Sequence, residues 1–262
     1  GAVTFGDKVG GGQSLASLRA TGPTTRNGDV TTSGTQTYNS AVTLGASATL
    51  ATTDSAVDFV STVDAKTAGT QGLAVAAGKG TVTFSGAVGG GKALASLAVT
   101  GPTKIGASIT TTGAQTYNSA VTMAASATLA TTNKAVDFVS TVDGTAGTEA
   151  LTVSAGNGAV TFGDKVGSGK SLASLAVTGP TTLNGNVTTS GTQTYNSAVT
   201  LGASATLATT NKAVGFTSTV DGTAGTEALT VNAGTGAVTF GDKVGNGKAL
   251  GSLAVTGPTT LN

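Results

Sequence analysis

The chain contains no histidine, no cysteine and no tryptophan, and aromatic residues make up only 4% of its 262 residues. Without histidine it lacks the commonest general base and metal ligand, and without cysteine it lacks a thiol nucleophile, a thiolate zinc site and any disulfide. A chain without cysteine is typical of bacterial products that are exported unfolded, although many cytosolic domains also lack cysteine. These absences exclude several classes of enzyme and favour an exported protein.

Charge is also scarce. Charged residues account for 10% of the chain, against an ordinary share of roughly 25%, and the formal net charge is +1. Nucleic-acid-binding proteins carry a strong basic bias, so we expect no nucleic-acid partner. No apolar run approaches the roughly 18 residues that a membrane-spanning helix needs.

What the sequence does contain is a long internal repeat. The pair Gly-Pro recurs at residues 22–23, 101–102, 179–180 and 257–258, in steps of 79, 78 and 78 residues. The segment Gln-Thr-Tyr recurs in the same phase, with its tyrosine at 38, 117 and 195. The repeat predicts one continuous array over residues 1–262, with units 1–79, 80–157, 158–235 and a partial unit 236–262, and no capping domains.

A shorter period lies inside each unit. Tyr117, Phe138, Phe162 and Leu183 are each followed four residues later by a valine, and apolar residues alternate with threonine around them. Such alternation indicates short strands with one buried face, and glycine and asparagine between them supply turns. A unit of about 20 residues cannot bury its apolar side chains alone, but stacked units can.

The sequence therefore predicts an all-β fold, namely a parallel β-helix (β-solenoid) with about 20 residues per coil and a 78-residue super-repeat. We expect right-handed coils, because crossovers between parallel strands usually have that hand. Four coils averaging 19.5 residues per unit is the preferred count. The alternative is a string of 78-residue β-sandwich domains, which the high glycine content and the missing tryptophan disfavour.

No combination of residues predicts catalysis, cofactor binding or metal binding, so the expected site residues are none and the expected cofactors are none. Paired carboxylates could serve a polysaccharide-cleaving β-helix, but most of the acids here are repeat equivalents of one another. The acids are Asp7, Asp29, Asp54, Asp58, Asp64, Asp137, Asp143, Glu149, Asp164, Asp221, Glu227 and Asp242. An active site is a single asymmetric constellation, so this repetition favours a surface pattern.

Three further motifs have structural interpretations. The steps Asp143-Gly144 and Asp221-Gly222 lack the glycine-rich context of calcium-binding repeats and favour tight turns. The stretches 9–13, 88–92, 167–170 and 245–248 lack the phosphate-loop pattern and indicate flexible corners. Threonine clusters such as 126–132 and 188–192 recur once per unit, so we expect no continuous threonine plane of the kind that binds ice.

The repeats resemble those of a known family. The segment Thr-Ser-Gly-Thr-Gln-Thr-Tyr-Asn-Ser-Ala-Val-Thr-Leu (32–44 and 189–201) and the segment Leu-Thr-Val-Asn-Ala-Gly-Thr-Gly-Ala-Val-Thr-Phe (229–240) are similar to repeats of very large bacterial surface exoproteins. These exoproteins are of the filamentous-haemagglutinin-like, two-partner-secretion or autotransporter type. The resemblance implies a right-handed β-helical shaft, export through an outer-membrane transporter, and a role in adhesion, biofilm or cell contact. It carries no catalytic residues.

These observations lead to a functional hypothesis. We expect the non-enzymatic structural shaft of an extracellular or cell-surface bacterial fibre or adhesin. Its expected partners are further copies or repeats of itself, by head-to-tail stacking, continuation of the array or lateral bundling, together with a glycan or cell-surface receptor. The alternatives are a glycan- or ice-binding solenoid face and, with less support, a polysaccharide-active enzyme.

Overall fold

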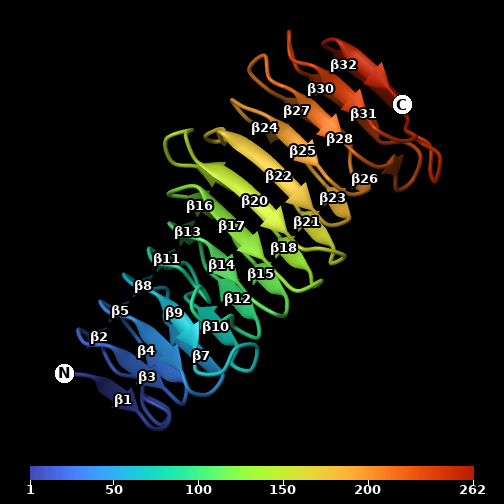
Figure 1. Ribbon diagram of the computed structural model, residues 1–262. Helices are drawn as coiled ribbons and strands as arrows, with labels where there is room; N and C mark the ends of the chain where they lie inside the picture. The colour runs from blue at the N-terminus through green and yellow to red at the C-terminus, as the bar shows by residue number, and fades with distance from the viewer.

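The computed structural model describes residues 1–262 and contains only short β-strands, with no helix (Figure 1). All strand pairs are parallel, and paired strands lie about 21 residues apart in the chain, so the backbone winds through about 12 turns. This arrangement confirms the predicted β-solenoid and excludes the chain of β-sandwiches. No helix capable of crossing a membrane is present.

Each turn contributes one strand to each of three sheets, which run along the whole length of the solenoid. Sheet I contains β1 (Val3–Phe5), β3 (Thr24–Arg26), β6 (Val42–Leu44), β9 (Val63–Ala65), β14 (Ile109–Thr110), β17 (Ala127–Ala130), β20 (Ala150–Ser154), β22 (Ser174–Thr178), β25 (Gln193–Tyr195), β28 (Val214–Phe216), β31 (Val238–Phe240) and β33 (Thr259–Leu261). Val88 bridges β9 to β14.

The other two sheets are built in the same way. Sheet II contains β4 (Val30–Thr32), β7 (Ala48–Thr52), β10 (Leu73–Ala76), β12 (Leu97–Thr100), β15 (Gln115–Tyr117), β18 (Val136–Phe138), β21 (Val160–Phe162), β23 (Thr181–Leu183), β26 (Val199–Leu201) and β29 (Val220–Gly222), extended by bridges from Val9 and Val244. Sheet III contains β2 (Leu18–Ala20), β5 (Gln36–Tyr38), β8 (Val57–Phe59), β11 (Val82–Phe84), β13 (Thr103–Ile105), β16 (Val121–Met123), β19 (Val142–Gly144), β24 (Val187–Thr188), β27 (Ala205–Ala208), β30 (Ala228–Asn232) and β32 (Ser252–Thr256), with Val166 bridging β19 to β24.

The strands are short because each must turn a corner after two to five residues. In most of them the first and third residues are buried and the middle residue is partly exposed, as in Val136–Asp137–Phe138. This is the alternation that the sequence shows, since successive side chains of a strand point to opposite faces of its sheet. The buried side chains form one hydrophobic cluster of 53 residues that extends from Ala20 to Phe240.

Aromatic rings stack along the axis inside this cluster. Phe138 lies between the rings of Tyr117 and Phe162, with centroid separations of 5.3 and 5.2 Å and interplanar angles of 12° and 5°. The same three-ring stack occurs once in each unit, as Tyr38–Phe59–Phe84 and Tyr195–Phe216–Phe240. A parallel strand spacing of about 4.8 Å brings equivalent side chains of neighbouring turns into contact, so few aromatic residues suffice to fill a narrow core.

The number of turns per unit differs from the preferred count. Gln36–Tyr38 lies in sheet III, its equivalent Gln115–Tyr117 lies in sheet II, and Gln193–Tyr195 lies in sheet I. With four whole turns per unit, all three segments would lie in one sheet. The expected 19.5 residues per turn was therefore too small, because the corner loops add residues that the strand pattern does not reveal.

Candidate functional sites

The carboxylates are distributed along the surface and do not converge. Asp58 and Asp137 face outward from β8 and β18, in sheets III and II, and Gly215 takes the equivalent place on β28 in sheet I. Asp7, Asp164 and Asp242 each accept a hydrogen bond from the backbone N–H of the next residue, at exposed corners. No three acidic side chains are placed to hold a metal ion. The one ion pair joins Lys8 to Asp29, at 3.7 Å between exposed side chains.

The Asp-Gly steps have a different role from the predicted tight turns. Asp143 and Asp221 lie in the strands β19 and β29, and their carboxylates reach the corner loop of the next turn. Oδ1 of Asp143 accepts hydrogen bonds from the backbone N–H groups of Gly169 at 2.8 Å and Lys170 at 3.4 Å. The same bonds join Asp64 and Asp221 to their loops. The interpretation as turn residues was therefore wrong, and these carboxylates fix one turn to the next.

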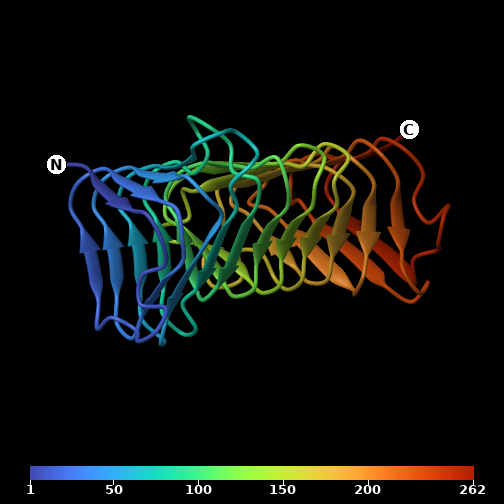
Figure 2. The ribbon, with the colours of Figure 1, turned by 90° about the horizontal axis from the view of Figure 1, so that it is seen from below.

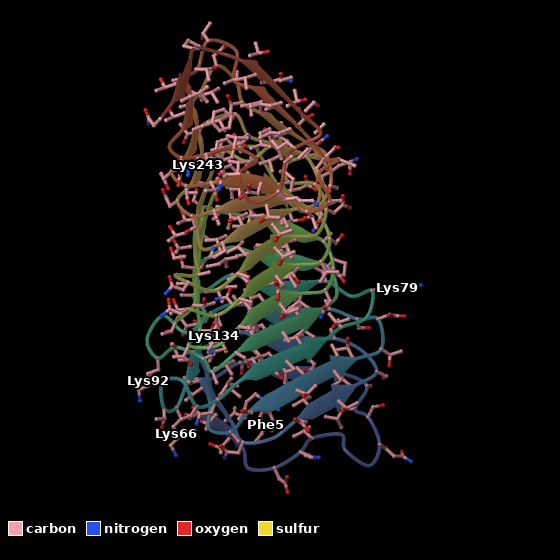
Figure 3. All side chains as sticks on the ribbon, turned by 90° about the vertical axis from the view of Figure 1, so that its right-hand side faces the viewer. Phe5, Lys66, Lys79, Lys92, Lys134 and Lys243 are labelled. Carbon is pink, nitrogen blue, oxygen red and sulfur yellow. The ribbon has the colours of Figure 1, made fainter.

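Two adjacent corner loops form a ridge in each unit. We define ridge one as residues 66–72 with 89–95, ridge two as 144–150 with 167–173, and ridge three as 222–228 with 245–251. Backbone hydrogen bonds join the two loops, for example from Gly69 N to Ala93 O at 2.8 Å and from Ala95 N to Gln71 O at 2.8 Å. Figure 2 shows loops of ridge one, in cyan to green, standing out from the body of the solenoid. In Figure 3, Lys66 and Lys92 lie on one side of the molecule, both on this ridge.

The glycine-rich stretches that begin the second loop of ridges one and two lie close against the backbone of the next turn. Gly89 and Gly167 have φ angles of 67° and 70°, which favour glycine. A Cβ atom on Gly167 would lie 2.1 Å from the carbonyl oxygen of Thr188 in the next turn. These glycines let the backbone of one turn approach the next, and the flexibility of the corners stays a prediction.

A buried carboxylate closes the first loop in ridges two and three. The carboxylate of Glu149 accepts hydrogen bonds from the backbone N–H groups of Ala146, Gly147 and Thr148, at 2.9 to 3.2 Å, and Glu227 makes equivalent bonds to Ala224 and Gly225. Burial alone would raise the pKa of Glu149, but the backbone N–H groups of the loop, Ala146 foremost, outweigh it and lower that pKa. The negative charge therefore helps to hold the loop closed.

This geometry predicts that acid loosens ridges two and three. A lowered folded-state pKa contributes stability at neutral pH that is lost as the pH falls through that value. In an NMR titration we expect the amide signals of Ala146 and Gly147 to shift with a midpoint below the ordinary glutamate value of 4.5. The matched control is Glu149→Gln, since Gln71 stands at this position in ridge one and accepts a hydrogen bond from Thr67 N at 3.0 Å. A midpoint at or above the ordinary value, or the same transition in the Gln variant, would contradict the assignment.

A second inter-turn contact uses residues with left-handed backbone. Asp54, Asn133 and Asn211 have φ angles of 52°, 54° and 56°, and they are the only residues other than glycine with positive φ. Oδ1 of Asn133 accepts a hydrogen bond from Asn157 N, one turn away, at 2.9 Å. Asparagine and aspartate tolerate this conformation better than other non-glycine residues.

We therefore expect Asn133→Ala to destabilise the protein by about 1–3 kcal/mol, because alanine is strained at this φ and cannot accept the hydrogen bond. Asn133→Asp should change the stability little, since Asp54 already occupies the equivalent position and accepts a bond from Lys79 N at 2.8 Å. Thermal and urea unfolding of both variants measures the difference. Equal stability of the Ala and Asp variants would show that neither the strain nor the bond matters.

Outward threonines align more than the sequence suggested. Thr161, Thr182 and Thr200 are neighbours on three consecutive turns of sheet II, between Asp137 and Asp221. The expectation of no continuous threonine plane is consistent with this arrangement, although the threonines align over a short stretch. This row is one residue wide and lies between two aspartates, so it forms a short column and not a plane.

The longest strands form a wider flat patch in each unit. Patch one lies on β7, β10 and β12, and its outward residues are Thr49, Ala51, Ala74, Ala76, Ala98 and Thr100. Patch two, on β17, β20 and β22, and patch three, on β27, β30 and β32, carry the equivalent small uncharged residues, including Ser154 and Asn232. Shallow hollows of about 260 and 160 Å³ border patches one and two, and serines line both of them.

Sequence reasoning missed two buried polar features. In each unit a fully buried glutamine donates to backbone carbonyls and accepts from the tyrosine hydroxyl two residues later; for Gln115 these bonds go to Ala130 O at 2.9 Å and come from Tyr117 at 3.1 Å. The recurring Gln-Thr-Tyr segment could have indicated this feature, because its glutamine and tyrosine take the two inward positions of a strand. The second feature, the buried Arg26, occurs once.

Arg26 takes a place that Ile105, Leu183 and Leu261 hold in the other units. Its guanidinium donates hydrogen bonds to Tyr38 Oη at 2.9 Å and Gly28 O at 2.8 Å and lies 5.2 Å from the ring centroid of Phe5. Its Nε atom is buried without a hydrogen-bond partner. Burial lowers the pKa of Arg26 and raises the pKa of Tyr38 to about 12.

The parallel sheets and the single core define the chain as a β-solenoid. Its surface carries inter-turn contacts, ridges and flat patches. No family model, no curated protein and no solved structure matches the chain. The resemblance to bacterial surface exoproteins, which rests on the repeat segments alone, therefore stays a prediction.

Proposed function

We propose that the chain is the structural shaft of an extracellular or cell-surface bacterial fibre or adhesin. In this role it acts without catalysis, as a long rigid rod for surface attachment, biofilm or cell contact. The observation that carries the proposal is the uninterrupted stacking of about 12 turns on one continuous core. Polar groups on its surface make hydrogen bonds that join one turn to the next, as Asp143, Asn133 and the ridge loops illustrate.

The proposal includes the finer features that the sequence predicts. We take the coils to be right-handed, because parallel crossovers are right-handed in nearly all known cases. We take the 78-residue unit to be the building block of the shaft. Its partners would be further repeats or copies of itself along the axis, a glycan or cell-surface receptor, and an outer-membrane transporter during export.

Electron microscopy of native material tests the shaft. Twelve turns at about 4.8 Å give a rod of about 60 Å for these 262 residues, so rods of this length or longer are expected. Small-angle scattering of the purified chain should give the same length with a constant cross-section. Compact round particles in either experiment would contradict the proposal.

A further inference from the structure

One column of outward side chains on sheet III carries charges of alternating sign. Over the seven strands from β2 to β19, the paired outward residues are Arg19, Thr37, Asp58, Thr83, Lys104, Thr122 and Asp143. The charge therefore changes from positive to negative and back at every second turn. Successive charges lie about 9.6 Å apart, which exceeds the screening length of about 8 Å at physiological salt. None of the four charges is in an ion pair within the chain.

Both cations of this charged column are departures from the repeat. Arg19 stands where the other units have alanine, at positions 98, 176 and 254, and Lys104 stands where they have threonine, at positions 25, 182 and 260. In the equivalent column of sheet II, which starts at Ala98, the only charges are Asp137 and Asp221. The equivalent column of sheet I has no charge. The alternation therefore belongs to one face of the solenoid.

The charged column is complementary to its own reverse. Two copies that face each other and run in opposite directions, with a two-fold axis at Thr83, place Arg19 opposite Asp143 and Lys104 opposite Asp58, each pair twice. Oδ2 of Asp143 is left for the partner, because its bonds to Gly169 N and Lys170 N use Oδ1. Copies that run in the same direction place like charges opposite each other, and a shift by two turns gives them three opposite-charge contacts instead of four. Electrostatic complementarity therefore favours the antiparallel order.

The face around the charged column has the area of a weak interface. We define this face as the seven strands with one residue on either side of each, and its only charged residues are the four of the column. It measures about 34 by 16 Å, so two facing copies would bury about 1,100 Å² in total. Weak and transient complexes have interfaces of this size, and stable ones bury about 1,600 Å². Asp54 and Lys79 lie at the corner beyond its edge, where the Lys79 side chain points away from the body (Figure 3).

We propose that two copies of the chain pair side by side and antiparallel through this face of sheet III. The pair is weak at physiological salt and strengthens as the salt concentration falls, because its contacts are exposed ion pairs. Sheets I and II lack an alternating column, so the association stops at two rods and does not grow into a bundle. This inference adds a lateral partner to the proposed shaft and rests on that proposal for the rod shape alone.

Sedimentation of the 262-residue chain over a concentration series measures the pairing. We expect pairs at about 10 mM NaCl and single rods at about 1 M NaCl, where the screening length falls from about 30 Å to about 3 Å. Arg19→Ala combined with Lys104→Thr, which restores the residues of the other units, should weaken pairing about tenfold or more at low salt. The matched control, Lys134→Ser with Lys212→Ser, removes the same charge outside the face and copies Ser55 of the first unit. It should pair like the natural chain.

Cross-linking tests the antiparallel order. The chain has no cysteine, so Thr37→Cys and Thr122→Cys each introduce a single thiol into the charged column. The proposed pair places residue 37 of one copy opposite residue 122 of the other, whereas identical residues lie about 19 Å apart along the axis. A thiol cross-linker that spans about 10 Å, the spacing of two facing sheets, should join the two variants when they are mixed and leave either variant alone largely unlinked.

Three results would overturn the proposal. They are a natural chain that stays single throughout the series at low salt, equal weakening in the face variant and the control, and cross-linking of like variants as readily as unlike ones. Small-angle scattering keeps these results separate from the shaft. Single rods at low salt contradict the pair alone, and compact particles contradict the shaft.

Discussion

Replacing Phe138 by alanine is expected to lower the free energy of unfolding by about 3–5 kcal/mol. The ring is 1% exposed and stacks on Tyr117 and Phe162 in the neighbouring turns. The substitution removes these contacts and leaves a cavity in the narrow core. Because each turn is held by its two neighbours, a cavity here weakens three successive turns.

Urea unfolding followed by circular dichroism measures the loss, and hydrogen exchange should place it in β15, β18 and β21. Asp137→Thr on the same strand is the matched control, since that side chain faces outward and threonine occupies the paired positions in both neighbouring turns, Thr116 and Thr161. We expect the control to stay within about 0.5 kcal/mol of the natural protein. A loss below about 1 kcal/mol for Phe138→Ala would mean that the core at this turn is not closely packed.

The second large effect that we expect is a gain in stability. Arg26→Leu is expected to stabilise the protein by about 1–4 kcal/mol, because apolar replacements of buried charged groups often do so. The guanidinium is fully buried, no carboxylate bonds to it, and Nε has no partner. Leucine already fills the equivalent place at Leu183, where Tyr195 donates its hydroxyl proton to Gln193, as Tyr38 does to Gln36 beside Arg26.

The reverse exchange, Leu183→Arg, supplies the control. It places an arginine in the same surroundings in the third unit, and we expect it to lower the melting temperature. If Arg26→Leu lowers the melting temperature as well, the contacts of Arg26 with Phe5 and Tyr38 outweigh the cost of burying its charge. The unfolding transitions of the two variants therefore decide whether this arginine stabilises or strains the first unit.

The sequence predicted the architecture because inward and outward positions differ so clearly. Valine, leucine and phenylalanine alternate with threonine in strands such as Val160–Phe162, and that pattern alone indicates stacked turns. The number of turns per unit could not be counted in the same way. Two strand positions are hard to recognise in the sequence, since Val166 makes only isolated bridges and β24 has two residues.

The surface contacts were harder to predict than the core. The sequence of Asp143-Gly144 suits a tight turn, and only the position of the next turn shows that the carboxylate binds Gly169 N there. Likewise, the sequence suggests flexible corners at Gly89 and Gly167. Only the structure shows that a carbonyl oxygen of the adjacent turn lies close to each of these glycines. Such contacts join residues about one turn apart, and their partners are set by register, which short motifs do not reveal.

Finally, the backbone hydrogen bonds of all three sheets lie nearly parallel to the long axis. A pulling force applied to the two chain ends would therefore load the terminal turn alone and peel it from its neighbour. Each turn of about 21 residues would release about 70 Å of extended chain in place of about 5 Å of rod. Under tension the molecule would lengthen in small successive steps and absorb mechanical work, while it stays stiff at rest.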